Sequence, residues 1–229
     1  MWGLFNQNIG LNQLRDSTRV MCFAAKWQGQ KGIEFYSEHH HGRQEMVEQA
    51  HRLLTEADVV AHYNGKRFDI PHLNREFVIA GMMPPAPYQQ LDFLEVVKRR
   101  FRMASNKLEW VSQALGIGAK VKHQGHEMWT LCLAGDPKAW REMEKYNKQD
   151  VALLEELHRV LLPWITTHPN RRLYGDGEGC PNCGSADLRR EGFAYTQVGR
   201  FQRYQCRACG TWSREGKRHD GTDIRGAAA

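Results

Sequence analysis

The sequence predicts an α/β domain followed by a small, cysteine-rich β module. Over residues 20–165 short apolar runs alternate with amphipathic helical stretches, a pattern typical of α/β sheets. The last quarter of the chain contains two Cys-x-x-Cys pairs, and the 229 residues are 41% hydrophobic and 25% charged, as in ordinary globular proteins. No apolar run reaches the roughly 18 residues of a membrane span, and no apolar leader opens the chain, so we expect a cytoplasmic protein.

Each element of the α/β domain has its own signal. A continuous apolar run predicts a strand at 20–25, and further short strands are expected at 33–36, 59–63 and 88–91. Apolar residues at helical spacing predict helices at 43–57, from Pro71 to Gly81, between a capping Ser105 and Gly116, and from Asp136 to about residue 165.

The strand and helix patterns end near residue 170, where the sequence becomes rich in Arg, Gly and Asp. This change sets the expected domain boundaries. We expect the α/β domain at 1–168, a linker at 169–179, the β module at 180–213 and a flexible tail at 214–229. Residues 1–169 carry 21 Lys+Arg against 19 Asp+Glu, a net charge of +2; residues 170–229 carry 11 against 7, a net charge of +4. The basic module suits a polyanionic partner.

The four cysteines of the β module have the spacing of zinc ligands. Two residues separate the sulfurs of each pair, 22 residues separate the pairs, and Gly184 and Gly210 follow them, so one tight turn presents two thiolates. Alternating residues on both sides of Gly199 predict a hairpin, and 211–213 could add a third strand. The segment resembles a zinc ribbon that binds one structural Zn²⁺ through Cys180, Cys183, Cys206 and Cys209. Two disulfides are the alternative, although nothing suggests an oxidising compartment.

Other cysteines, histidines and arginines have simpler interpretations. Cys22 and Cys132 lie in apolar surroundings and are expected to be packing residues. The consecutive residues 39–41 are all histidine, and an exposed loop is favoured over a metal site. Aromatic residues alternate with the arginines of the ribbon, which are Arg189, Arg190, Arg200, Arg203 and Arg207. This composition suits phosphate contact and base stacking. The alternative is a ribbon with a purely structural or protein-docking role.

Two constellations in the α/β domain carry possible chemistry. Asn64 and Asp69 lie at a strand-to-helix junction, and Tyr146 and Asp150 are four residues apart on one helical face. A carboxylate at the core edge, such as Asp150, is costly unless it binds a cation or a donor. Each constellation alone is weak evidence for catalysis, because aspartates in helices are usually solvated. Asp92, at the end of a predicted strand, is a candidate accessory carboxylate or a helix cap.

Together, these constellations resemble motifs II and III of the tyrosine-bearing DEDD 3′–5′ exonucleases, which have a ribonuclease-H-like fold. The form Asn-x-x-x-Phe-Asp-x-Pro-x-Leu at 64–73 is similar to the exonuclease domains of family B DNA polymerases. The segments 2–10, 105–108 and 145–151 extend the resemblance to predicted bacterial and phage exonucleases, over about residues 1–168.

The resemblance implies a mixed sheet flanked by helices and phosphodiester hydrolysis by two Mg²⁺ or Mn²⁺ ions about 4 Å apart. It implies that Asp150 holds the nucleophile-side metal, Asp69 supports the second metal, and Tyr146 orients the attacking water. Asn64 would position the turn or the 3′-terminal nucleotide. The implied substrate is single-stranded DNA or RNA in a bacterial or phage-infected cell, with replication or repair proteins as possible partners.

One part of the family pattern is missing. The first motif, Asp-x-Glu on the first strand, should lie about ten residues before Trp2, and the chain starts at Met1. The sole Asp-x-Glu present, at 176–178, reads as linker. Three interpretations stay open: a truncated start, a catalytically inactive nucleic-acid-binding or repair-complex module, or a site completed by another chain. Whether the chain is an enzyme is therefore open at this stage.

Overall fold

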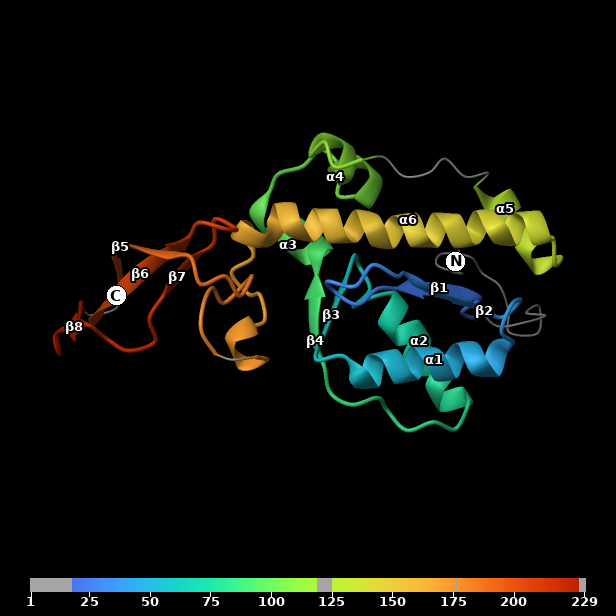
Figure 1. Cartoon of the computed structure of the whole chain (residues 1–229), viewed down its shortest axis with the longest axis horizontal. Helices are drawn as coiled ribbons and strands as arrows, with labels where there is room; N and C mark the ends of the chain where they lie inside the picture. The colour runs from blue at the N-terminus through green and yellow to red at the C-terminus, as the bar shows by residue number, and fades with distance from the viewer. Residues whose placement is uncertain (1–17, 119–124, 176, 227–229) are drawn as a thin grey trace. The chain divides into compact units, whose positions relative to one another are not determined.

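The structure is a computed structural model that describes residues 18–118, 125–175 and 177–226 (Figure 1). The chain divides into two compact units. One comprises residues 1–57, 65–87 and 121–151, and the other comprises 58–64, 88–120 and 152–229. The helix α6 (Pro137–Leu161) contributes its residues up to Val151 to the first unit and the rest to the second.

The first unit combines an antiparallel strand pair with helices. Strand β1 (Cys22–Ala25) pairs with β2 (Glu34–Ser37), and the helices are α1 (Arg43–Glu56), α2 (Asp69–Ile79) and α5 (His126–Leu133). The predicted apolar stripe of α1 is confirmed as its buried face: Met46, Val47, Ala50, Leu53 and Leu54. A second cluster joins α5 to α6, where the indole of Trp140 donates to the Cys132 carbonyl at 2.9 Å.

The second unit contains a parallel pair, β3 (Val59–His62) and β4 (Gln89–Asp92). Helices α3 (Phe93–Arg100) and α4 (Leu108–Ala114) follow β4. Their apolar faces pack with the last turns of α6 into one core: Leu91, Phe93, Val96, Val97, Val111, Leu157, Leu161 and Ile165. The predicted mixed α/β architecture is confirmed, and its antiparallel and parallel ladders are separate in the described residues.

Helix ends mostly follow the predicted signals. Gly81 and Gly116 have φ values of 71° and 68° and follow α2 and α4. The Asp136 carboxylate accepts from the amides of Lys138 and Ala139 at 2.7 and 2.9 Å and so opens α6. The predicted Ser105 cap is wrong, because Lys107 is the N-cap of α4 and the Ser105 hydroxyl accepts only from the Lys107 amide.

The C-terminal sheet has the predicted hairpin at its centre. Strand β5 (Leu188–Tyr195) pairs with β6 (Gly199–Cys206), and β7 (Trp212–Arg214) adds the expected third strand. A register shift interrupts the hairpin between Arg190 and Phe193. Residues expected to form a tail include β8 (Asp220–Gly221), which pairs with the start of β6.

Two buried polar side chains connect this sheet to the end of α6. The Asn182 amide donates to the carbonyls of Leu162 and Ile165 at 3.0 and 2.9 Å, and the Thr211 hydroxyl donates to the Leu162 carbonyl at 3.4 Å. Leu162 opens the 3₁₀ turn η2 (Leu162–Trp164), which follows α6. The orphan carbonyls at a helix terminus thus find donors in the cysteine-rich module. None of the helices in the described part of the chain combines the length and apolar character that crossing a membrane requires.

Candidate active site and four-cysteine cluster

The junction between β3 and α2 places Asn64 and Asp69 on a tight turn. Asn64 has a φ of 66°, a left-handed conformation that asparagine tolerates better than most residues. The carbonyl of Gly65 accepts from the amides of Phe68 and Ile70 at 3.2 and 2.9 Å, which starts α2. Asp69 stands exposed in the first turn of α2, where the helix dipole favours a carboxylate. Asn64 belongs to the second unit and Asp69 to the first.

Asp92 fixes the Asn64 turn from the neighbouring strand. Its Oδ1 accepts from the amides of Asn64 and Leu94 at 2.8 and 3.0 Å, and its Oδ2 lies 3.4 Å from Nδ1 of His62. Burial raises the pKa of Asp92, but the contact with His62 and the hydrogen bonds from the amides of Asn64 and Leu94 outweigh burial and hold the pKa below its usual value. Of the two roles considered, Asp92 therefore takes the structural one, as cap of α3 and anchor of the turn.

Tyr146 and Asp150 lie on consecutive turns of α6, in the same unit as Asp69. Tyr146 packs half-buried against the α5–α6 cluster, so its ring is held by apolar contacts. Asp150 is half-buried, and its Oδ1 is buried from solvent. Between them, the Asn147 side-chain amide lies 3.7 Å from the sulfur of Cys22, which places β1 beside this part of α6.

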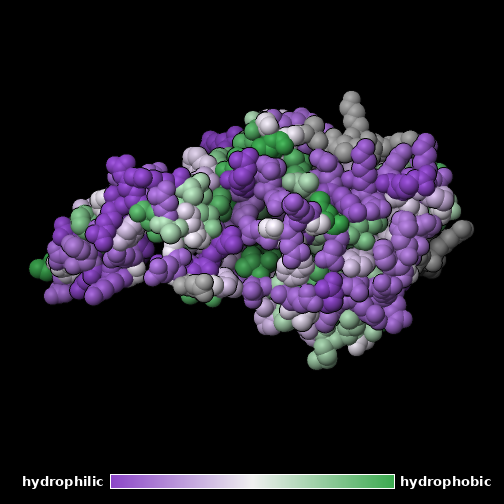
Figure 2. Space-filling view, viewed as in Figure 1, coloured by the Kyte–Doolittle hydropathy of each residue, from purple (hydrophilic) through white to green (hydrophobic). Residues whose placement is uncertain are grey.

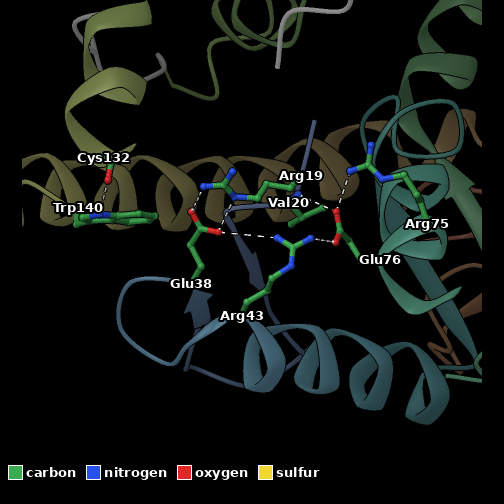
Figure 3. A network of polar contacts seen from close by, with 8 residues as sticks. All are labelled: Arg19, Val20, Glu38, Arg43, Arg75, Glu76, Cys132 and Trp140. Atoms are coloured by element: carbon green, nitrogen blue, oxygen red, sulfur yellow. Dashed lines mark hydrogen bonds and ion pairs between the residues drawn. The ribbon is translucent and has the colours of Figure 1, made fainter. Parts of the chain in front are cut away.

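Helix α2 is held by a buried carboxylate (Figure 3). Glu76 is 2% exposed; its Oε1 accepts from Arg75 at 2.8 Å and from the Val20 amide at 3.1 Å, and its Oε2 accepts from Arg43 of α1. Burial raises the pKa of Glu76, but the donors Arg75, Val20 and Arg43 outweigh it and lower the pKa. Glu76 lies two turns after Asp69, so the network fixes the helix that carries the candidate ligand.

The aspartates are suitable donors for a hard divalent cation. Mg²⁺ prefers carboxylate oxygens and commonly uses one or two of them together with water and phosphate oxygens. Asp69 and Asp150 supply that donor type. Among the described residues, no further group of three or more His, Cys, Asp or Glu gathers closely enough to hold an ion, apart from the four cysteines. Within the linker Asp-x-Glu, Asp176 lies outside the described residues, and neither Gly177 nor Glu178 is in a helix or strand.

The four predicted cysteines converge. All four sulfurs lie within 4.8 Å of one another, with 3.7 Å between Cys180 and Cys209 and 3.6 Å between Cys183 and Cys206. A tetrahedral zinc ion with Zn–S bonds of about 2.3 Å separates its sulfurs by about 3.8 Å, whereas a disulfide requires about 2.05 Å. The cluster therefore fits a zinc ion, and the cysteines are not paired as disulfides.

Local geometry supports the two cysteine turns. Gly184 and Gly210 have φ values of 80° and 78°, as the glycine after each pair predicted. The amide of Ser185 donates to the sulfur of Cys183 at 3.5 Å. Burial raises the pKa of Cys180 and Cys183. Metal binding must therefore displace protons from these thiols, and zinc affinity should fall in acid.

The histidine loop at 39–41 and the cysteines outside the cluster offer neither a metal site nor a reactive thiol among the described residues. The loop at 39–41 is a turn with His39 and His40 exposed, as expected; His39 stacks on Trp140 with ring centres 5.1 Å apart. Cys132 is buried, as predicted, and burial raises its pKa to about 11. Burial likewise raises the pKa of Cys22 to about 12, which makes both poor nucleophiles.

Sequence patterns alone did not single out Asn182, Thr211 or Glu76. Asn182 lies between the first two cysteines and Thr211 follows the second pair, positions where polar residues ordinarily look like solvated turn residues. In the sequence, Glu76 looks like a charged residue on the exposed side of a helix. The available signal was weak: Asn182 and Thr211 are short hydrogen-bonding side chains within two residues of a predicted zinc ligand, and Glu76 precedes the buried Phe77.

The comparisons with known proteins give one family. No curated protein matches the chain. A family model described as the RNase_H superfamily matches residues 9–162, which are 154 of the 229 residues and include Asn64, Asp69, Tyr146 and Asp150. The match confirms the predicted ribonuclease-H-like fold and indicates nuclease-like activity on nucleic acid. On this evidence the chain belongs to the RNase H superfamily.

Proposed function

We propose that the protein is a metal-dependent 3′–5′ exonuclease that hydrolyses phosphodiester bonds at single-stranded DNA or RNA ends. The observation that carries this proposal is the arrangement of its functional residues within the matched region. Tyr146 and Asp150 occupy successive turns of α6, and Asp69 opens α2 in the same unit. A module that only binds nucleic acid would need none of these three side chains.

The residues have distinct roles in this proposal. Asp150 and Asp69 hold Mg²⁺ or Mn²⁺, with water and substrate oxygens completing the coordination. Such ions lower the pKa of bound water and stabilise the charge that develops on the phosphate. The Tyr146 hydroxyl orients the attacking water, which its packed ring allows. Asn64, whose amide is held by Asp92, positions the turn after β3 or the 3′-terminal nucleotide.

We further propose that Cys180, Cys183, Cys206 and Cys209 bind one structural Zn²⁺, so that the C-terminal module is a zinc ribbon. The sulfur separations of 3.6 and 3.7 Å support this assignment. The module is too small to fold on its apolar core alone, so the metal would supply much of its stability.

A nuclease assay with matched variants tests the exonuclease. The substrate is a 5′-labelled single strand with added Mg²⁺ or Mn²⁺, and the variants are Asp150→Asn and, as a control, Glu156→Gln on the same helix. We expect a 3′ ladder that depends on the added ion and that Asp150→Asn reduces more than about 100-fold, since even outer-shell partners of metals are worth about 10- to 100-fold. Glu156 is an exposed carboxylate beside Arg159, so its variant should retain activity.

Equal activity of the Asp150→Asn variant and the unmodified chain would contradict the proposed site. Binding without hydrolysis by the unmodified chain would favour the second candidate, a nucleic-acid-binding module. The arginine-rich C-terminal sheet supports that candidate, because residues 188–214 carry six arginines and one carboxylate, Glu191.

A further inference from the structure

The C-terminal sheet presents arginine and aromatic side chains on one face. In β6, Phe201 and Arg203 point to the same side because side chains alternate along a strand. In β7, Arg214 is directly opposite Arg203, and Trp212 is opposite Gln205, two residues further along the same face. These four side chains, Phe201, Arg203, Trp212 and Arg214, form the β6–β7 face.

Each arginine of the β6–β7 face lies on an aromatic ring of the other strand. The Arg214 guanidinium carbon is 3.9 Å from the Phe201 ring centre, and the Arg203 carbon is 4.7 Å from that of Trp212. Both separations are within the range of cation–π contacts. The stacking holds both guanidinium groups at the sheet surface.

The β6–β7 face concentrates positive charge. Like charges directly opposite each other in a sheet are destabilising, and Arg203 and Arg214 are such a pair. In the described residues, neither guanidinium has a carboxylate within 4 Å, whereas Arg189, Arg200 and Arg207 each pair with one. The Arg203 Nε donates to the Glu191 carbonyl at 2.9 Å, which orients the group without neutralising it. An anion that bridges the two arginines would relieve their repulsion.

Beside this charge lies an aromatic surface open to solvent. Trp212 is 50% exposed, and β7 is the last strand in the order β5-β6-β7. The visible surface of the C-terminal sheet, at the left of Figure 2, is mainly hydrophilic with a few apolar side chains. That composition favours a polyanion that carries planar groups over a largely apolar protein partner.

We propose that the β6–β7 face binds single-stranded nucleic acid, with phosphates at Arg203 and Arg214 and a base stacked on the face of the Trp212 ring that Arg203 does not cover. This inference rests on the proposed function for its partner, and it assigns the C-terminal sheet the role of holding the strand. Phosphate contact and base stacking together are the usual basis of single-strand binding without sequence preference. Because the anions would be backbone phosphates, the site should accept any base sequence.

Fluorescence anisotropy with the full-length protein tests the inference. The probes are a labelled oligothymidylate and an abasic strand of equal length, without chelator, so that zinc remains bound. The variants are Trp212→Leu, the pair Arg203→Gln/Arg214→Gln, and the control pair Arg200→Gln/Arg207→Gln. Arg200 lies in β6 and Arg207 in the turn that follows β6. The control therefore removes the same charge from the same module, but from arginines that are already paired with carboxylates.

The expected results separate stacking from charge. Trp212→Leu should weaken oligothymidylate binding about 5- to 150-fold and leave abasic binding unchanged. The Arg203/Arg214 pair should weaken binding of both probes and reduce the slope of log affinity against log salt by about 1.4, or about 0.7 for each lost phosphate contact. The control pair should have a clearly smaller effect. Zinc content equal to that of the unmodified protein verifies that each variant folds.

Three results would overturn the inference: unchanged affinity in both β6–β7 variants, an equal loss in the control pair, or full displacement of the strand by polyglutamate at matched charge. The nuclease assay keeps this separate from the exonuclease proposal. Hydrolysis with no dependence of binding on Trp212 would refute only the β6–β7 site, and Trp212-dependent binding without hydrolysis would refute only the exonuclease.

Discussion

Asp92 and Asn64 join the ends of the two parallel strands through one hydrogen bond. The Asn64 amide donates to Oδ1 of Asp92 at 2.8 Å, two residues beyond the register pair His62 and Asp92. The same oxygen accepts from the Leu94 amide and caps α3. A single buried carboxylate thus ends β4, starts α3 and holds the left-handed turn before α2.

Replacing Asp92 with alanine should destabilise the protein by about 2 kcal/mol, because a helix cap and a buried acceptor are lost together. Asp92→Asn keeps an acceptor oxygen and should cost less. The folded-state pKa of Asp92 is lowered, so its contribution to stability is present above the unfolded value of about 3.9 and is lost as pH falls through the folded pKa. Urea unfolding at pH 7 and at a pH well below the unfolded value of about 3.9 measures both effects, and equal stability of all three proteins at pH 7 would contradict the assignment.

Glu76 should be one of the most sensitive positions outside the candidate site. Glu76→Ala removes the carboxylate that accepts from Arg43 and Arg75 (Figure 3). The two arginine side chains are 42% and 30% exposed and can regain water, so the expected loss is about 2 kcal/mol, the range for hydrogen bonds to charged groups. The exposed Glu48 of α1 is the matched control, with an expected change within about 0.5 kcal/mol for Glu48→Gln. Chemical denaturation gives the comparison, and similar losses in the two variants would contradict the network.

Removal of zinc should unfold the C-terminal sheet. We expect about one zinc per chain in protein purified without chelator, and Cys183→Ser should lose most of it. Cys132→Ala removes a buried thiol outside the cluster and should retain the zinc. Metal analysis together with limited proteolysis of residues 180–214 checks the prediction. A zinc-free but protease-resistant wild-type protein would show that the four cysteines have another role.

His158 should make stability fall in mild acid. Burial, with His168 and Arg171 nearby, lowers the pKa of His158 to about 4, opposed only in part by Glu155. The unfolded state, with a pKa near 6.5, therefore binds more protons between about pH 4 and 6.5, and stability rises with pH across that window. The expected loss between pH 7 and 5 is about 2 kcal/mol. His158→Phe retains an aromatic ring stacked on Phe93 and should reduce this pH dependence. Chemical denaturation at several pH values between about 5 and 7 measures it, and an unchanged slope of unfolding free energy against pH would contradict the role of His158.

Most elements could be predicted because their signals are local. The predicted strands begin and end within two residues of β1 to β4, and Asp136 and Gly116 bound helices as expected. Helices α3 and α5 were not predicted. Each has eight residues, and helices this short depend on tertiary contacts, since isolated helices below about 12 residues are marginal.

The sequence by itself determined the features that depend on neighbouring residues in the chain: the two cysteine turns with Gly184 and Gly210, and the one-turn spacing of Tyr146 and Asp150. Only the tertiary structure decided that Asp92 holds the Asn64 turn, that Glu76 is buried among arginines, and that Arg203 lies opposite Arg214. The reason is physical. Backbone angles and helical periodicity are encoded within a few residues, whereas burial, ion pairing and strand register depend on segments that are far apart in the chain.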